Sequence, residues 1–422
     1  MRIQRPRLAT GLIPALFIAC VPSVAIGESA AFDSAIGDDP SPWSVEYELS
    51  LQLIREREDV FAPLGGGEAN RSAAELRLNV QLQCDRGACQ DTRLVLKPRL
   101  SLDDDERPRD MPDPQPDALA EGYLLQSLGE GQLGLGKRLL GWGPSLLYSP
   151  TNRLFPDNGA ATPRRDIPGK PMAFASMPLS PRGRLNLLVA DPRLDEVDGI
   201  RRGGAFGLAR AEWNWVQSQI TTLGAVAGGG GGLHSYFGGY VQHGLDDAWT
   251  LGAEAAASRG YARRASSGVG EEPLAQNENR WHWDGTLNLR YGASSGAEIG
   301  LELIYNGYAM SDSEVANPLI AAMPSAGSSP SRNRPLHPFV QRRYALLQGT
   351  WPKLFGDRRW GLTARVLQGL EQSSTDSFLE LSFSPTDTST LYLGHAHSRV
   401  PESLLMSRPV PRSTYVAMEL FF

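Results

Sequence analysis

Apolar and polar residues alternate along segments of about ten residues, and this pattern constrains the fold more than any other feature of the sequence. In 44–54 (SVEYELSLQLI) every second residue is apolar and the residues between are polar. The segments 74–83 and 94–102 largely repeat the pattern. Because successive side chains of a β-strand point to opposite faces, each segment predicts a strand with one apolar and one polar face. About ten residues is the length of a tilted membrane-crossing strand and is long for a soluble sandwich.

Along the whole chain the same pattern gives eighteen candidate strands. After the first three they lie near 119–128, 132–140, 170–178, 183–190, 204–215, 217–227, 233–243, 248–257, 280–292, 296–308, 340–352, 359–368, 376–384, 389–397 and 412–422. Long connections, such as 103–118 and 141–171, alternate with tight turns such as 129–131. Outer-membrane barrels alternate long external loops with short periplasmic turns in the same way. The sequence therefore predicts an all-β fold, a transmembrane antiparallel outer-membrane β-barrel of about 18 strands (16–18), with long extracellular loops.

The N-terminus has the pattern of a Sec signal peptide. Three arginines precede the apolar run 8–26, and small residues favour a cut near Gly27. An uncleaved membrane anchor and a lipoprotein attached at Cys20 are the alternatives. The predicted organisation is a signal peptide at 1–27, a short periplasmic N-terminal segment at 28–43 and an outer-membrane β-barrel at 44–422. The expected location is the cell outer membrane, with outer-membrane lipid and lipopolysaccharide as the surroundings.

The C-terminal segment 415–422 (YVAMELFF) ends on Phe422, with apolar residues at every second position before it. It resembles the terminal signature by which the barrel-assembly machinery recognises outer-membrane proteins, so this machinery is an expected partner through Phe422. Tryptophans near predicted strand ends, among them Trp281 and Trp283, are expected to form aromatic girdles at the membrane surfaces. Stacking platforms in the lumen are the alternative.

Charge and composition argue against several functions. The net charge of −6 argues against binding to nucleic acid. Cys84 and Cys89 bracket Asp-Arg-Gly-Ala, and in an oxidising compartment they predict a local disulfide. His395 and His397 have the spacing of a two-ligand metal site, but leucines share their face, which is expected to meet lipid. Motifs of hydrolases, zinc proteases and phosphate loops do not occur. We therefore expect no catalytic residue, no metal, no cofactor and no enzymatic activity.

The connection 141–171 is too rich in proline and glycine for a helix, and too rich in Trp, Leu, Tyr and Phe for a solvated linker. It predicts a large folded loop, and loops on a rigid scaffold often carry binding sites. Its aromatic faces suit pyranose rings, and its polar and cationic groups suit hydroxyls and anions. The candidate ligand-binding residues are Trp142, Tyr148, Asn152, Arg153, Asp157, Arg164, Arg165 and Lys170. Alternatively, Trp142 and Pro144 fold the loop and the arginines pair with acids on the barrel wall.

Residues 136–171 carry a resemblance to a known family. The segment resembles the signature of the capsule assembly protein Wzi family. The matching positions are Trp142, Gly143, Pro144, Leu146, Ser149, Asn152 and Pro156. The resemblance implies a non-enzymatic outer-membrane β-barrel that attaches or assembles surface exopolysaccharide and binds an anionic polysaccharide. The type member has a helical element ahead of its barrel, for which 28–43 is too short. Porin-like barrels share part of the pattern, so the alternative is an outer-membrane channel for anionic small molecules or exported polymer, with the same arginines at a constriction.

Overall fold

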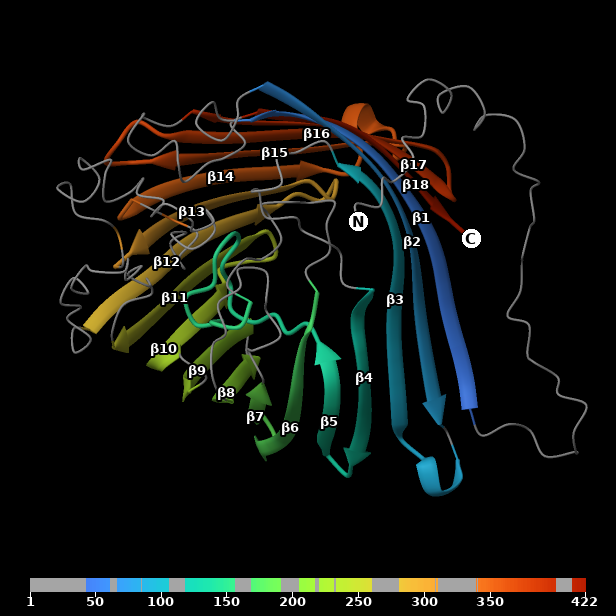
Figure 1. Ribbon diagram of the computed structural model, residues 1–422. Helices are drawn as coiled ribbons and strands as arrows, with labels where there is room; N and C mark the ends of the chain where they lie inside the picture. The colour runs from blue at the N-terminus through green and yellow to red at the C-terminus, as the bar shows by residue number, and fades with distance from the viewer. Residues whose placement is uncertain are drawn as a thin grey trace, which may run out of the picture. The chain divides into compact units, whose positions relative to one another are not determined.

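The protein forms a barrel of eighteen β-strands in the computed structural model (Figure 1). The structure describes residues 43–60, 67–84, 86–105, 118–155, 168–190, 205–216, 220–230, 233–259, 281–307, 309, 339, 341–399 and 412–422. The strands are β1 (Trp43–Val60), β2 (Gly67–Cys84), β3 (Thr92–Asp105), β4 (Leu119–Leu128), β5 (Gly131–Arg138), β6 (Lys170–Ser180), β7 (Gly183–Ala190), β8 (Phe206–Val216), β9 (Ile220–Gly230), β10 (Leu233–Gly244), β11 (Trp249–Arg259), β12 (Trp281–Gly292), β13 (Glu298–Asn306), β14 (Arg343–Trp351), β15 (Trp360–Gly369), β16 (Thr375–Thr386), β17 (Ser389–Arg399) and β18 (Arg412–Phe421).

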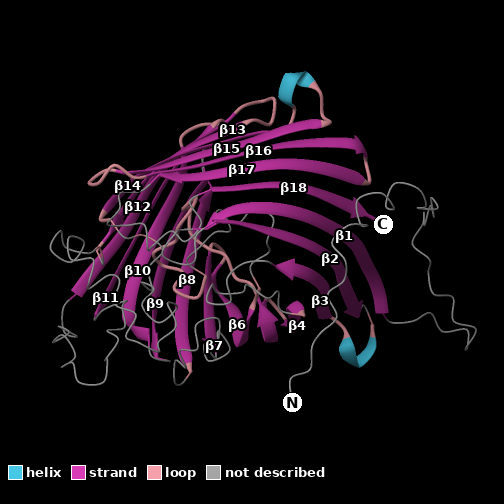
Figure 2. Ribbon diagram, turned by 45° about the horizontal axis from the view of Figure 1, so that its top comes forward, coloured by secondary structure: helices cyan, strands magenta, loops and turns pink. Residues whose placement is uncertain are grey.

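Each strand pairs antiparallel with its two neighbours in sequence, and β1 pairs with β18 to close the ring (Figure 2). Leu51 lies opposite Leu420 in this closing pair. Closure removes the strand edges whose unpaired N–H and C=O groups lipid cannot satisfy. The predicted fold class and strand count are confirmed. β1 and β2 are longer than predicted because their charged ends, such as Arg55–Glu58, hide the apolar alternation.

The barrel has two different ends, which we call the short-turn end and the long-loop end. Tight connections such as Leu128–Gly131 lie at the short-turn end, together with two 3₁₀ turns, Gly87–Cys89 and Leu354–Gly356. Cys84 and Cys89 form a disulfide there, with their Cα atoms 5.7 Å apart. The connections from β5 to β6 and from β13 to β14 lie at the opposite end.

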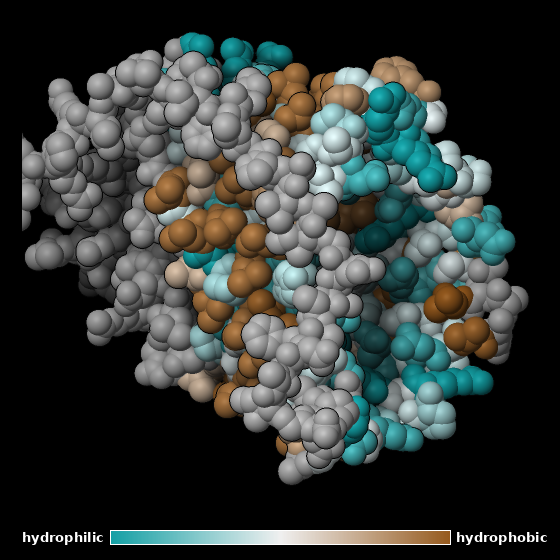
Figure 3. Space-filling view, turned by 90° about the vertical axis from the view of Figure 1, so that its right-hand side faces the viewer, coloured by the Kyte–Doolittle hydropathy of each residue, from teal (hydrophilic) through white to brown (hydrophobic). Residues whose placement is uncertain are grey.

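Alternation along each strand separates an inner face from an outer face. On β12 the inward His282 and Asp284 are buried, whereas the outward Trp281 and Trp283 are 47% and 54% exposed. Both tryptophans meet the ring of Phe237, at centroid distances of 5.5 and 6.1 Å. They therefore lie on the outer face, as a girdle requires, and do not line the lumen. Figure 3 shows hydrophobic side chains gathered in a band on the surface, with hydrophilic groups beside it.

His395 and His397 also belong to the outer face. They alternate on β17 with inward residues such as Gly394 and follow the exposed Leu391 and Leu393. In the part of the chain that the structure describes, no group of three or more His, Cys, Asp or Glu residues could hold a metal ion. No helix within those same residues is long and apolar enough to cross a membrane.

Candidate functional site

The connection after β5 folds into the barrel. Its described part, residues 139–155, is called the inner loop here; in Figure 1 it lies within the ring of strands. Its side chains and backbone contact inward-facing residues of β10–β13. Pro144 reaches deepest, against Gly252, which is only three residues from the short-turn end of β11. The inner loop therefore crosses much of the length of the lumen.

Glu254 is the central anchor of the inner loop. It projects inward from β11 and is 3% exposed. Its Oε1 accepts hydrogen bonds from Ser149 Oγ at 2.5 Å, Thr151 N at 2.8 Å and Thr151 Oγ1 at 2.6 Å. Its Oε2 accepts one from Ser145 Oγ at 2.7 Å. A hydrogen bond to a charged group contributes about 1.5–3 kcal/mol, so this carboxylate holds the loop strongly.

Asp284 on β12 is the second anchor and is 1% exposed. Its Oδ2 accepts hydrogen bonds from Arg153 Nη2 at 2.9 Å and from Tyr148 OH at 3.2 Å, while Oδ1 accepts one from Gly307 N at 3.1 Å. The Arg153 side chain is 14% exposed. Removing one partner of a shielded ion pair costs about 3–5 kcal/mol. Arg153 therefore acts as a fastener of the loop in this structure.

Glu302 on β13 is the third anchor and is fully buried. Its two oxygens accept hydrogen bonds from the backbone N–H groups of Leu146 at 2.5 Å and Leu147 at 3.2 Å. Arg290 of β12 donates a hydrogen bond to the backbone carbonyl of Pro144. Backbone groups that leave water must find such partners. Side chains of the wall thus provide the hydrogen-bond partners for the backbone of this irregular segment, whereas in the barrel the neighbouring strand provides them.

Two glycines of the wall leave room for side chains of the inner loop. A Cβ at Gly252 would lie 2.6 Å from the Cβ of Pro144, and one at Gly300 would lie 2.6 Å from Leu146 Cδ1. Both distances are far below van der Waals contact. Any larger residue at either position would have to displace the loop. The wall and the inner loop are therefore complementary in shape as well as in hydrogen bonding.

Trp142, Gly143 and Pro144 form the turn at the deep end of the inner loop. Gly143 has φ +85°, and a Cβ there would lie 2.4 Å from Glu254 Oε2, so glycine is required on two counts. The indole Nε1 of Trp142 donates to Thr151 Oγ1 at 3.1 Å. The sequence motif therefore folds the loop back on itself.

Apolar packing holds both flanks of the inner loop. One cluster joins Trp142, Leu154 and Phe155 to inward residues of β6–β11. A second joins Leu147 and Tyr148 to Phe339 and to inward residues of β13–β15. The ring of Tyr148 meets that of Phe339 edge-on at 5.4 Å. The loop is thus fixed to the wall from β6 round to β15.

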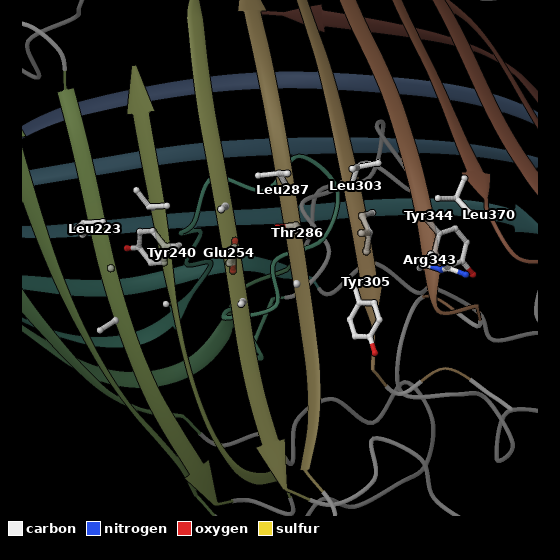
Figure 4. A pocket seen from close by; sticks show the side chains of 18 of the residues that line it. Leu223, Tyr240, Glu254, Thr286, Leu287, Leu303, Tyr305, Arg343, Tyr344 and Leu370 are labelled. Carbon is white, nitrogen blue, oxygen red and sulfur yellow. The ribbon is translucent and has the colours of Figure 1, made fainter. Parts of the chain in front are cut away.

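The wall behind the anchors carries small residues on its outer side. Ala225, Gly239, Ala255 and Gly285 lie side by side on β9–β12, and they line an apolar depression in the outer face. Figure 4 shows this stretch, with Glu254 between the neighbouring strands that carry Tyr240 and Thr286. At this level the wall therefore carries only small side chains on its outer face, whereas the inner loop packs against its inner face.

Cations line the opposite wall. Five of them project inward from β2 and β3, and we call them the β2–β3 cations: Arg71, Arg77, Arg93, Lys97 and Arg99. They extend from Arg93 near the short-turn end to Arg71 near the long-loop end.

These cations have neighbours of two kinds. Arg77 lies 2.6 Å from Glu75 Oε1, and Arg99 3.7 Å from the same oxygen, so these two share a carboxylate. Lys97 pairs with Glu121, yet its side chain keeps 38% exposure. Arg93 is exposed and donates to a neutral amide, that of Gln81. Arg93 and Lys97 are therefore the cations that present most charge to lumenal water.

The structure brings five of the predicted ligand-binding residues together in the lumen. They are Trp142, Tyr148, Asn152, Arg153 and Lys170. Asn152 is fully buried, donates to Leu140 O and accepts from Phe155 N, and Lys170 Nζ lies 5.3 Å from the centroid of the Phe155 ring. Asp157, Arg164 and Arg165 lie outside the described residues.

Trp142 and Tyr148 are 8% and 1% exposed, so protein atoms cover the faces expected to stack on sugars. Arg153 pairs with Asp284 of the wall, as expected from the alternative in which the loop arginines pair with acids on the barrel wall. The anchors Glu254, Asp284 and Glu302 were not singled out from the sequence. They occupy polar positions of alternating strands, where an inward acid looks like any lumen-lining residue.

The fold is similar to that of solved outer-membrane porins. OpdK of Pseudomonas aeruginosa, solved with vanillate, shares 14% identity at a TM-score of 0.53, covering 90% of this chain and 98% of that chain. A BenF-like porin from Pseudomonas fluorescens Pf-5 shares 12% identity at a TM-score of 0.52, and OccAB2 of Acinetobacter baumannii shares 10% at 0.52, each with 90% and 98% coverage. No protein-family model and no curated protein sequence matches the chain.

At these identities the likeness shows the fold alone: the chain has the closed eighteen-strand barrel of large outer-membrane porins. These neighbours support the resemblance to porin-like outer-membrane barrels that the sequence also carries. The comparisons do not support membership of the capsule assembly protein Wzi family. The shared signature therefore reflects a way of turning a loop, with Trp142, Gly143 and Pro144 at its tip.

Proposed function

We propose that the protein is an outer-membrane channel for small anions, with its pore between the inner loop and the wall of β16–β18 and β1–β3. The observation that carries the proposal is the placement of the β2–β3 cations along that wall. The two apolar clusters of the inner loop lie against β6–β11 and β13–β15, and thus leave this wall to line the passage.

Electrostatics supports anions as the solutes. Rings or rows of Arg and Lys select anions in pores, since a low-dielectric wall concentrates their field in the water between. Arg93 and Lys97 present the most exposed charge of the row. The porin OpdK was solved with the anion vanillate, which agrees with this solute class for a barrel of the same fold.

Polysaccharide attachment is less well supported. The aromatic faces that would stack on sugar rings are covered in the structure, as shown for Trp142 and Tyr148. An anionic sugar acid small enough to pass the inner loop would remain a permissible solute of the channel.

Reversal potentials across planar bilayers under a KCl gradient test the proposal. Wild-type channels should prefer chloride, and Arg93→Glu with Lys97→Glu should abolish or reverse that preference, because two lumenal charges change sign. The matched control is Arg343→Glu, which changes a cation on the outer face. An unchanged reversal potential in the lumenal variant, or the absence of any channel from folded wild-type protein, would refute the proposal.

A further inference from the structure

We infer that a cationic patch on the outside of the barrel binds the phosphate groups of lipopolysaccharide. The patch spans β17, β18 and β1 near the long-loop end, and it is called the outer basic patch: Arg55, Arg57, His395, His397, Arg399 and Arg412. This inference rests on the outer-membrane location contained in the proposed function, but it concerns a different surface and a different ligand from the channel.

Alternation places the patch on the outer face. Glu56, between Arg55 and Arg57, faces the lumen, where it accepts a hydrogen bond from Ser413 and lies 3.8 Å from Arg71. Arg55 and Arg57 therefore face outward, and both are exposed. The same reasoning applies on β17 and β18, where the buried Gly394 and Tyr415 face inward.

Strand register brings the members of the patch together. Arg412 lies opposite His397 on the adjacent strand, and Thr414 lies between His395 and Arg57. Paired strands are about 4.8 Å apart, so the Cα atoms of Arg57 and His395 are separated by about 10 Å. Such a spacing lets cations from three strands reach one phosphorylated headgroup. Asp59 of β1 is opposite Arg412 in register.

The patch sits directly against an apolar surface. Val416 is opposite both Arg55 and Leu393 in register, and it is 56% exposed while Leu393 is 54% exposed. Below them on β1, the alternating Leu53, Leu51 and Leu49 continue the apolar band. An outward apolar band about 25 Å tall meets acyl chains, and cations at its edge meet headgroups. The ligand must therefore be an amphiphile with acyl chains and an anionic head.

Lipopolysaccharide is the occupant that fits the position. The long-loop end faces the cell exterior in outer-membrane barrels, where the lipid carries phosphates above its acyl chains. Arginine forms bidentate hydrogen bonds with phosphate, and the patch carries four arginines. An arginine near an anionic membrane surface contributes about fivefold to affinity, so removing two should weaken binding about 30-fold.

The test measures binding of bisphosphorylated lipid A to the purified full-length protein in neutral detergent, by native mass spectrometry. Arg55→Gln with Arg57→Gln should weaken binding about 30-fold. Removing the phosphates from the lipid should weaken wild-type binding similarly and abolish the difference between the two proteins. Arg399→Gln, at the end of β17, serves as a second, milder variant if the double variant assembles poorly.

The matched control is Arg259→Gln with Arg343→Gln, which removes two outward arginines near the same end on β11 and β14. This control should bind lipid A like the wild type. Equal weakening in the control, equal binding of dephosphorylated lipid, or displacement of lipid A by millimolar inorganic phosphate alone would each overturn the site. Channel recordings of the same proteins separate the two ideas. If the wild type conducts but binds lipid A with and without phosphates equally well, only this inference is refuted. If the folded wild type does not conduct, the proposed channel is refuted.

Discussion

Removing the carboxylates that anchor the inner loop should widen the channel in two steps. Glu254, Asp284 and Glu302 accept four, two and two hydrogen bonds from the loop. At about 1.5 kcal/mol each, these contribute about 12 kcal/mol to docking. The five buried apolar side chains of the loop contribute about 2 kcal/mol each, or about 10 kcal/mol. Against this, ordering residues 141–155 costs about 1.2 kcal/mol per residue, or about 18 kcal/mol.

These magnitudes separate the single from the triple variant. Glu254→Ala alone removes about 6 kcal/mol, which turns a net docking energy of about 4 kcal/mol into a preference of about 2 kcal/mol for release, so both states remain populated. The triple variant, with alanine also at Asp284 and Glu302, loses about 12 kcal/mol, so the loop should leave the wall. We therefore expect flickering between two conductance levels in the single variant and a steady, larger conductance in the triple variant.

Single-channel recording in planar bilayers measures both effects, and heat-modifiability on a gel shows that the barrel is folded. Glu380→Ala is the matched control, because Glu380 is a buried, inward acid that accepts a hydrogen bond from Tyr415 of β18. It should keep the wild-type conductance. Wild-type conductance in a folded triple variant would show that the carboxylates neither hold the loop nor restrict the pore, which would refute this prediction.

Three further predictions concern single positions. Gly143→Ala should loosen the inner loop and raise the current noise, because positive φ costs a non-glycine residue about 1–3 kcal/mol and the methyl group would collide with the carboxylate of Glu254. The control Gly141→Ala should leave the noise unchanged, because the space around its Cβ position is open. Leu420→Asp should lower the amount of protein in the outer membrane on fractionation, because it puts a charge on the outer apolar face of the closing strand. Hydrogen bonding by Arg359 holds the pKa of the Asp357 carboxyl below its usual value, so this pair stabilises the turn above the ordinary pKa and the stabilisation disappears as the pH falls through the lowered pKa. Asp357→Asn should remove that acid-dependent part of the thermal stability. A melting temperature whose pH dependence is the same in the variant and the wild type would contradict the prediction.

The barrel could be predicted from the sequence because its determinants are local. Period-two alternation gives the strands, and the regular exchange of tight turns and long connections gives their order around the ring. The ends of β1 and β2 escaped prediction, since Arg55, Arg57 and Glu58 make both faces of the strand polar. Strand length beyond the apolar band depends on pairing between neighbours, which one strand's sequence does not reveal.

The direction of the loop could not be predicted in the same way. Its composition showed a folded segment, but whether it stands outside or enters the lumen depends on distant residues such as Glu254 and Glu302. Wall glycines were the available signal. Gly252 and Gly300 occupy inward positions where a barrel open to water would carry polar side chains, and each receives a side chain of the loop. Glycine at alternating lumenal positions is therefore a sign that another part of the chain packs there.

The arrangement of charges also explains how an acidic chain can form an anion channel. The net charge of −6 describes the whole molecule, but a solute responds to the groups near its path. Glu254, Asp284 and Glu302 lie beneath the inner loop, where loop donors surround them and the partly shielded Arg153 pairs with Asp284. The exposed Arg93 and the partly exposed Lys97 stand on the opposite wall. Docking of the loop therefore does two things at once: it narrows the lumen, and it covers carboxylates that would otherwise repel the proposed solutes.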